Sequence, residues 1–427
     1  MLKTREATVK MSKYCLKDAR VIDPSQNLDK TLDLTVANGV ITFGSAGDSM
    51  ESIDCSGKII MPGMIDIRGH LHEPENLSSA SNAAASGGYT TILIMSNIGA
   101  PADNAGTVHL MREKASKDSN IQILQCGCLT KASQGKALAP LGSLKEAGVV
   151  AVSDCPSSPQ NTEIFARGLE YASMFELPVI EFPRDLAIST RGVAHDGAFS
   201  LKMGIGGYPR MAEELFVQRA ITVCKNLCTR IHLTSISSAG SVELIREAKS
   251  KGIMITADST AHHLALTDER LMGYNTNSKT MPPLREESDR LAILEGIKDE
   301  TIDCISSAHE PCQKHEKEVE FDLAPAGAIG YETALSVVFE QLSQSLKDPF
   351  PLIAKTMSLN PSRILKVKSE IAEGKRANLF VFDPSVSWTY KVDEGKSAAQ
   401  NSPYENMEMK GSVLMTFSNG EKVFTIS

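Results

Sequence analysis

No apolar stretch in this 427-residue sequence approaches the ~18 consecutive apolar residues that a membrane-spanning helix requires. The N-terminal segment MLKTREATVKMSKYC also lacks the apolar centre of a signal peptide. We therefore expect a cytoplasmic protein that takes no part in a membrane.

An excess of basic residues is missing as well. The 44 Lys and Arg residues are outnumbered by 52 Asp and Glu residues, which gives a net charge of −8. Proteins that bind nucleic acids by electrostatic attraction carry a basic patch, and none stands out here. We therefore expect no nucleic-acid partner.

The nine cysteines lack a repeating spacing. The close pairs Cys126/Cys128 and Cys224/Cys228 have neither a second pair nor a histidine at zinc-finger distance. We therefore expect reduced, buried thiols of the kind found in the cytosol.

Short β-rich runs occupy both ends of the chain. Asn38-Gly39 and Asn419-Gly420 are typical of the turns of β-hairpins. Two such ends around one long middle predict a discontinuous β-sandwich domain formed by residues 1–61 and 366–427. The predicted strands lie at 14–21, 32–37, 40–43, 58–61, 378–383, 387–391, 412–418 and 422–426.

The middle of the chain alternates short apolar runs with amphipathic helical stretches. Eight such β/α units predict an α/β fold, a (β/α)8 TIM barrel over residues 62–365, with its chemistry at the carboxyl ends of the strands. The long segment 185–203 after the fifth strand is either a lid or contact loop or a variable surface loop. The predicted barrel strands are 64–67, 89–95, 121–126, 149–152, 178–182, 230–234, 253–256 and 302–306.

The first predicted barrel strand leads into a specific motif. Residues 61–74, MPGMIDIRGHLHEP, resemble the pattern Pro-Gly-x-Ile-Asp-x-His-x-His-x-Arg-x-Pro of the dihydroorotases and related cyclic-amide hydrolases of the amidohydrolase superfamily. Two histidines two apart on a strand point the same way and reach one metal ion. Here the first of the two positions is Arg68 and the second is His70.

The resemblance continues through most of the chain. Within the family, the chain is similar to the bacterial type I-like dihydroorotase branch. Further motifs of the family follow in order at 84–97, 256–264, 282–285, 324–335, 360–363 and 401–404.

The resemblance implies six metal-ligand positions. They fall at Arg68, His70, Asp154, Phe182, Ser235 and Ala308. Only His70 and Asp154 keep a residue type that binds the metal in the family, and the aspartate that would serve as the general base is Ala308. His232 and His309 are the other histidines of this region that a relict site could use. We therefore expect a degenerate site with no bound metal, or zinc if the protein is active after all.

The substrate-binding positions implied by the family are also altered. His72 stands in place of the arginine that binds the substrate carboxylate, and Met281 replaces an asparagine, whereas Asn97 keeps its type. We further hypothesise that the guanidinium of Arg68 replaces the metal and pairs with Asp154. The alternative is that Arg68 points to solvent.

Four functions stay open. The resemblance favours a non-catalytic, dihydroorotase-like partner of aspartate transcarbamoylase in pyrimidine biosynthesis. The others are an active dihydroorotase, which interconverts dihydroorotate and N-carbamoyl-L-aspartate, a scaffold of the dihydropyrimidinase-related kind, and a metal-free enzyme with a new substrate. By the same resemblance we expect a homodimer or a larger homo-oligomer.

Overall fold

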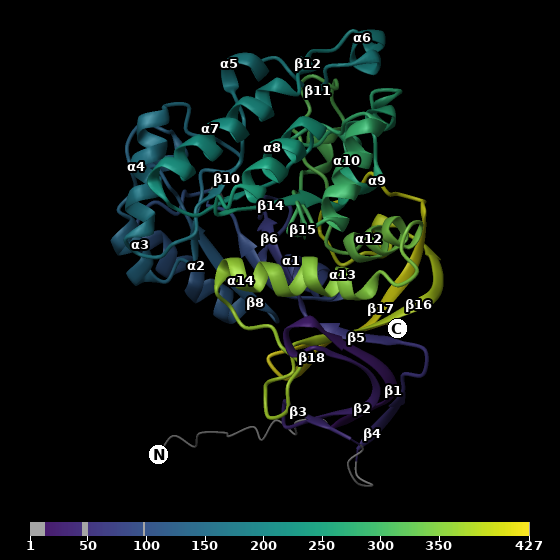
Figure 1. Cartoon of the computed structure of the whole chain (residues 1–427). Helices are drawn as coiled ribbons and strands as arrows, with labels where there is room; N and C mark the ends of the chain where they lie inside the picture. The colour runs from purple at the N-terminus through teal and green to yellow at the C-terminus, as the bar shows by residue number, and fades with distance from the viewer. Residues whose placement is uncertain (1–12, 45–49, 97–98, 427) are drawn as a thin grey trace, which may run out of the picture.

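The computed structural model describes residues 13–44, 50–96 and 99–426. Its centre is a barrel of eight parallel strands, which confirms the predicted fold (Figure 1). Two four-stranded sheets, in the orders β6-β7-β8-β9 and β10-β13-β14-β15, are joined by a bridge between Val152 and Val179. The strands are β6 (Met64–Gly69), β7 (Tyr89–Ile94), β8 (Gln122–Gly127), β9 (Ala151–Val152), β10 (Ile180–Glu181), β13 (Ile231–Leu233), β14 (Ile255–Thr260) and β15 (Cys304–Ser306).

The barrel closes between its first and last strands through a buried carboxylate. Asp66 on β6 accepts hydrogen bonds from the backbone N–H and the hydroxyl of Ser307, both at 2.8 Å. The backbone N–H of His70 also donates to the carbonyl of His309 at 3.0 Å. Asp66 is fully buried, so these bonds satisfy a carboxylate that water cannot reach.

Helices surround the barrel, and four of them begin at polar caps. Asn76, Asn104, Asn161 and Ser238 each accept a backbone N–H of the first turn through the side chain. The main helices are α1 (Leu77–Ser86), α2 (Ala105–Asp118), α3 (Leu141–Ala147), α4 (Thr162–Ser173), α7 (Met211–Leu227), α8 (Ala239–Ser250), α10 (Glu287–Lys298), α12 (Ala334–Ser343), α13 (Phe350–Ala354) and α14 (Asn360–Leu365).

Strands from both chain ends join in one sheet beneath the barrel in the view of Figure 1. The order is β18-β17-β16-β5-β1-β2-β3, and β4 pairs with β1. The predicted strands are therefore present, and hydrogen bonds link them into a single sheet. The boundaries at residues 61/62 and 365/366 stay a prediction. The strands are β1 (Tyr14–Asp23), β2 (Leu28–Ala37), β3 (Val40–Phe43), β4 (Glu51–Asp54), β5 (Ile59–Pro62), β16 (Leu379–Thr389), β17 (Glu408–Ser418) and β18 (Glu421–Thr425).

The segment after β10 is more regular than the sequence indicates. It forms α5 (Leu186–Ser189), β11 (Ala194–His195) and α6 (Ala198–Met203), and β11 pairs with β12 (Gly207–Tyr208). The carboxylate of Asp185 accepts the backbone N–H groups of Ala187 and Ile188 and so starts α5. The expectation of an irregular loop is wrong here, and a lid or contact role stays a prediction.

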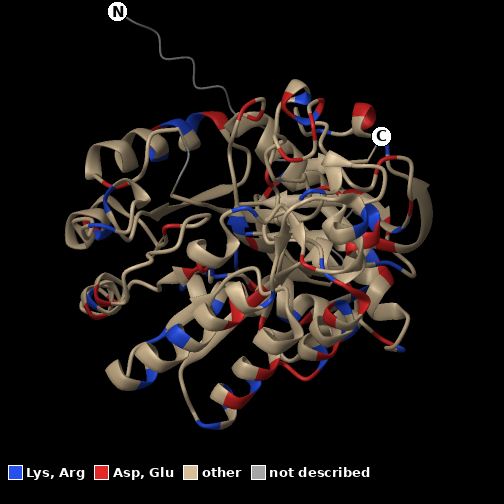
Figure 2. Cartoon of the chain, turned by 90° about the horizontal axis from the view of Figure 1, so that it is seen from above, with Lys and Arg blue, Asp and Glu red and all other residues tan. Residues whose placement is uncertain are grey.

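Two further expectations concern the surface and the thiols. Basic and acidic residues alternate over the outer helices rather than gathering by sign (Figure 2). No helix among the described residues is long and apolar enough to cross a bilayer.

All nine cysteines are free, and eight of them are buried. Cys228 is exposed, so the prediction of burial is wrong for that residue.

The buried carboxylate that closes the barrel has a pH-dependent effect on stability. Burial raises the pKa of Asp66 from 3.8 to about 6, although the hydrogen bonds from Ser307 act to lower it. A raised folded-state pKa contributes stability that is fully present below the unfolded-state pKa and is lost as the pH rises through the folded-state value.

We therefore expect the stability of the wild type relative to Asp66→Asn to fall by about 2 kcal/mol between pH 4 and pH 7. Urea unfolding of both proteins at a series of pH values measures this difference. An equal difference in unfolding free energy between the two proteins at every pH would contradict the raised pKa of Asp66. Asp66→Ala, which leaves both Ser307 donors unpaired, should be destabilised at every pH by about 2–4 kcal/mol.

Candidate functional site

A buried guanidinium occupies the carboxyl end of the barrel, where the active sites of such barrels lie. The side chain of Arg68 on β6 is 1% exposed. Its Nη2 donates to the backbone carbonyl of Met281 at 3.1 Å and lies 3.4 Å from Oε2 of Glu310. The guanidinium carbon lies 5.9 Å from the centre of the Phe182 ring. The mouth of the barrel, which is its carboxyl end, therefore contains a fixed cation held by one carboxylate and one carbonyl.

The carboxylate that pairs with Arg68 is not the predicted one. The oxygens of Asp154 accept the backbone N–H of Thr130 at 2.9 Å and the hydroxyl of Thr130. Burial raises the pKa of Asp154, while these hydrogen bonds oppose the rise. The hypothesis of an Arg68–Asp154 pair is therefore wrong, because Thr130 already satisfies Asp154 and Glu310 lies nearer to the guanidinium. The alternative, an Arg68 exposed to solvent, is wrong as well.

Three other predicted site residues are buried and offer little to a metal ion. Phe182 and Ala308 have no side-chain donor atom. The backbone N–H of Ser235 donates to Asp258 at 3.1 Å, and its hydroxyl lies 3.3 Å from that of Thr234. A serine hydroxyl is protonated at neutral pH, which makes it a poor zinc ligand compared with thiolate, imidazole or carboxylate.

His70 lies in the mouth with both ring nitrogens buried and without a hydrogen-bond partner among the described residues. Burial, followed by the nearby charge of Arg68, lowers its pKa well below 6.5. The ring is therefore neutral at pH 7. It stacks on His72, with ring centroids 5.8 Å apart.

His70, His72 and Glu310 form the group in the mouth that comes nearest to a metal site. One ligand atom from each lies within 4.8 Å of the other two. Two imidazoles and one carboxylate are a ligand set that catalytic zinc uses. The single carboxylate, however, is already paired with Arg68, and a dication would lie beside a fixed positive charge. As it stands, the group does not fit a zinc ion.

The two remaining histidines named by sequence have structural partners. His232 contacts the hydroxyl of Thr256 and a carboxylate oxygen of Asp258, both at 2.9 Å. His309 stacks on Tyr331 with centroids 4.0 Å apart, and burial lowers its pKa to about 3. Among the described residues, Asp154, His232 and His309 join no group of three potential metal ligands.

The substrate-binding positions named by sequence are only partly brought together. His72 is half-buried beside His70, and the backbone of Met281 contacts Arg68. Asn97 lies outside the described residues.

Sequence reasoning missed two acidic residues of this region. Glu310 lies two residues after Ala308, where the family has its aspartate, and Asp258 lies within the motif 256–264. Both were visible in the sequence as carboxylates close to positions that the resemblance names. That proximity was the available signal.

A second acidic and histidine group lies beyond β10. One ligand atom from each of His195, Asp268 and Glu286 lies within 4.8 Å of the other two. Arg285, however, donates to Nδ1 of His195 at 3.1 Å, so the neutral ring carries its proton on Nε2. Burial, followed by the charge of Arg285, lowers the pKa of His195 to about 4. A protonated Nε2 has no lone pair for a metal ion, so the group does not fit one in this arrangement.

The partner of Arg68 can be tested by double-mutant cycles. We expect Arg68→Met and Glu310→Gln to couple by about 1–3 kcal/mol in urea unfolding, because each single change strands a buried polar group. The matched pair Arg68→Met and Asp154→Asn should be additive within ~0.5 kcal/mol. Strong coupling to Asp154 with none to Glu310 would contradict the observed pairing.

Comparison with known proteins shows where this site belongs. A family model described as dihydro-orotase-like matches residues 57–241, and one described as the amidohydrolase family matches residues 208–423. A dihydroorotase of Endomicrobium trichonymphae is 40% identical over 96% of this chain and 99% of its own length. A dihydroorotase of Pelobacter propionicus is 37% identical over 96% and 99%.

Solved structures agree on the fold. An L-hydantoinase (dihydropyrimidinase) from Arthrobacter aurescens has a TM-score of 0.85 at 19% identity and covers 98% of both chains. A dihydropyrimidinase from Brevibacillus agri NCHU1002 has a TM-score of 0.83 at 20% identity, over 97% of this chain and 95% of its own. At these identities the likeness concerns the fold alone.

Proposed function

Because the chain belongs to the dihydroorotase-like branch of the amidohydrolase family, we propose that it is a non-catalytic member. It acts in the cytoplasm, in pyrimidine biosynthesis, as a structural or regulatory partner of aspartate transcarbamoylase. We also propose that it forms a homodimer or a larger homo-oligomer. One observation carries the proposal: the buried guanidinium of Arg68 in the mouth of the barrel.

The charge of Arg68 opposes metal binding at the family's ligand positions. A guanidinium stays protonated at any physiological pH, so it cannot yield its place to a dication by losing a proton. Its contact with Glu310 leaves the mouth with one cation and one anion that cancel. Of the six ligand positions only His70 and Asp154 keep a ligand type, and the oxygens of Asp154 are bonded to Thr130.

A proton acceptor is also lacking where the family has one. Opening or closing a cyclic amide requires a proton to be taken up and passed on as the C–N bond breaks or forms. Ala308 has no group that can do so. His309, its neighbour, is stacked on Tyr331, and its Nδ1 accepts the backbone N–H of Gly330 at 3.3 Å.

The likeness in sequence favours this branch over a scaffold of the dihydropyrimidinase-related kind. Identity to the named dihydroorotases is 37–40%, against 19–20% for the dihydropyrimidinases of similar fold. The intact barrel and its Asp66 closure support selection on a folded surface rather than on the mouth. A partner chain is the most direct use of such a surface.

A second candidate function is an active dihydroorotase with a rearranged metal centre. It is favoured by the proximity of His70, His72 and Glu310, which would supply two imidazoles and a carboxylate if Arg68 moved away from Glu310. In that case the ligands would come from positions that the family uses differently.

The activity test separates the two candidates. The protein is purified from a host that lacks its own dihydroorotase, and cyclisation of N-carbamoyl-L-aspartate is assayed with added zinc beside a zinc-loaded dihydroorotase. We expect turnover at least roughly 10⁴-fold below the active enzyme, because general base and metal are both missing, together with substoichiometric zinc by metal analysis. Turnover well above background that His72→Ala and Glu310→Gln abolish would support the second candidate instead.

The partner role has its own test. The same preparation is mixed with aspartate transcarbamoylase of the same organism and examined by size-exclusion chromatography with light scattering. We expect co-elution as one complex, and a change in transcarbamoylase activity or thermal stability. Separate elution at concentrations of tens of micromolar, with unchanged activity, would contradict the partner role.

A further inference from the structure

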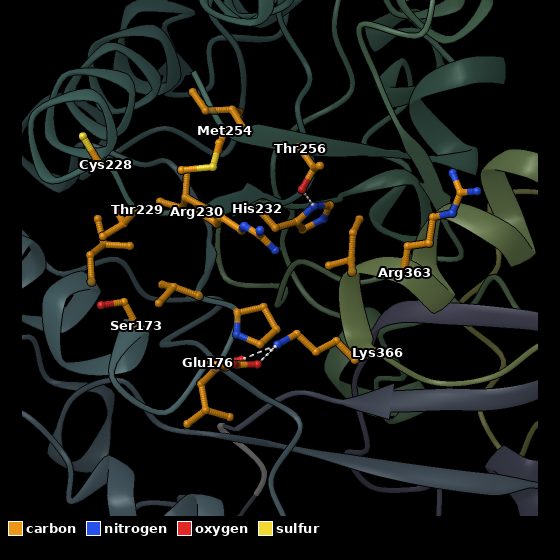
Figure 3. Close-up of a pocket in the computed structure, with 17 residues that line it drawn as sticks. Ser173, Glu176, Cys228, Thr229, Arg230, His232, Met254, Thr256, Arg363 and Lys366 are labelled. Atoms are coloured by element: carbon orange, nitrogen blue, oxygen red, sulfur yellow. Dashed lines mark hydrogen bonds and ion pairs between the residues drawn. The ribbon is translucent and has the colours of Figure 1, made fainter. Parts of the chain in front are cut away.

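A cavity of about 640 Å³ opens at the end of the barrel opposite the mouth (Figure 3). Its lining comes from the amino-terminal ends of three neighbouring strands: Pro178 and Val179 lead into β10, Arg230 into β13, and Met254 into β14. Helix α4 adds Leu169 and Ser173 to the lining, and α14 adds Arg363 and Ile364. None of the predicted mouth residues except His232 reaches it, so the cavity is a separate place in the fold.

The walls of the cavity are largely apolar. Leu169, Val179, Ile231, Ile255 and Ile364 contribute aliphatic side chains to the lining. A volume of this size lies within the ~300–1,000 Å³ that is typical of small-molecule sites. The apolar walls would bind the hydrocarbon or aromatic part of a ligand.

Positive charge is available at the same place. Arg230 and Arg363 line the cavity, are exposed, and have no ion pair or side-chain hydrogen bond with any residue that the structure describes. Lys366 is paired with Glu176 at 2.6 Å. Figure 3 shows Arg230 between Thr229 and His232, with Arg363 on the far side of His232. The unpaired guanidinium of Arg230 is therefore the group best able to bind an anion.

We propose that this cavity binds a small amphipathic anion, with an apolar body against the aliphatic walls and an acidic head on Arg230. The acidic head is a carboxylate or a phosphate monoester, since both have oxygens that a guanidinium binds in a bidentate manner. The site is independent of the barrel mouth and does not depend on the proposed function.

The native exposed thiol gives a direct test. Cys228 lines the cavity and is the single exposed cysteine of the nine. The probe is 8-anilinonaphthalene-1-sulfonate, an aromatic anion, whose fluorescence is titrated with the full chain. We expect saturable binding, and slower alkylation of Cys228 by iodoacetamide at saturating probe, with Cys228→Ser as the unlabelled control.

Variants separate this cavity from other apolar surfaces. We expect Arg230→Gln to weaken probe binding about tenfold, since one charge-assisted contact is lost. Ser173→Trp, an exposed position on the lining, should block the cavity without disturbing the core. Arg191→Gln, at an exposed arginine outside the lining, is the matched control and should bind as the wild type does.

Competition identifies the acidic head. Decanoate and decyl phosphate are used to displace the probe, with decanol as the neutral control. Displacement by either or both acids, at concentrations where decanol has no effect, supports the proposal and distinguishes carboxylate from phosphate. The proposal is overturned if decanol competes equally, if neither acid competes, or if Arg230→Gln and Ser173→Trp leave binding and Cys228 protection unchanged.

Discussion

The contact between Arg68 and Glu310 governs the chemistry of the barrel mouth. A guanidinium that is 1% exposed must be balanced within the fold, because a buried charge without a partner costs several kcal/mol. Glu310 and the carbonyl of Met281 provide that balance. The charge of Arg68 then helps to keep His70 neutral, and Phe182 presents its ring to the guanidinium. The mouth is organised around a protein cation.

One carboxylate connects the two ends of the barrel. Asp258 on β14 bonds His232, which lines the cavity opposite the mouth. Asp258 also accepts hydrogen bonds from the backbone N–H of Ser235 and the hydroxyl of Ser306 near the mouth. His232 and Ser235 are thus joined by two hydrogen bonds to the same carboxylate.

The barrel could be predicted from sequence because its strands are short apolar runs at regular spacing, and each of the eight forms where expected. The motifs named Arg68, His70 and His72, which lie together in the mouth, but also Asp154, whose oxygens bond to Thr130. The partner of Arg68 could not be predicted, because the choice between Asp154 and Glu310 depends on which acid another side chain already satisfies. Thr130, which settles that choice, belongs to no matched motif. The cavity opposite the mouth could not be predicted either, because its lining comes from segments far apart in the sequence that no motif joins.

The buried ion pair also limits how this barrel can change. If Arg68 alone is replaced by histidine, Glu310 remains buried without its cation. If Glu310 alone is lost, the guanidinium remains without its anion. Each single step towards a metal-binding mouth therefore passes through a less stable intermediate. Evolutionary paths of one substitution at a time are thus hindered, because either single change leaves one buried charge without its partner.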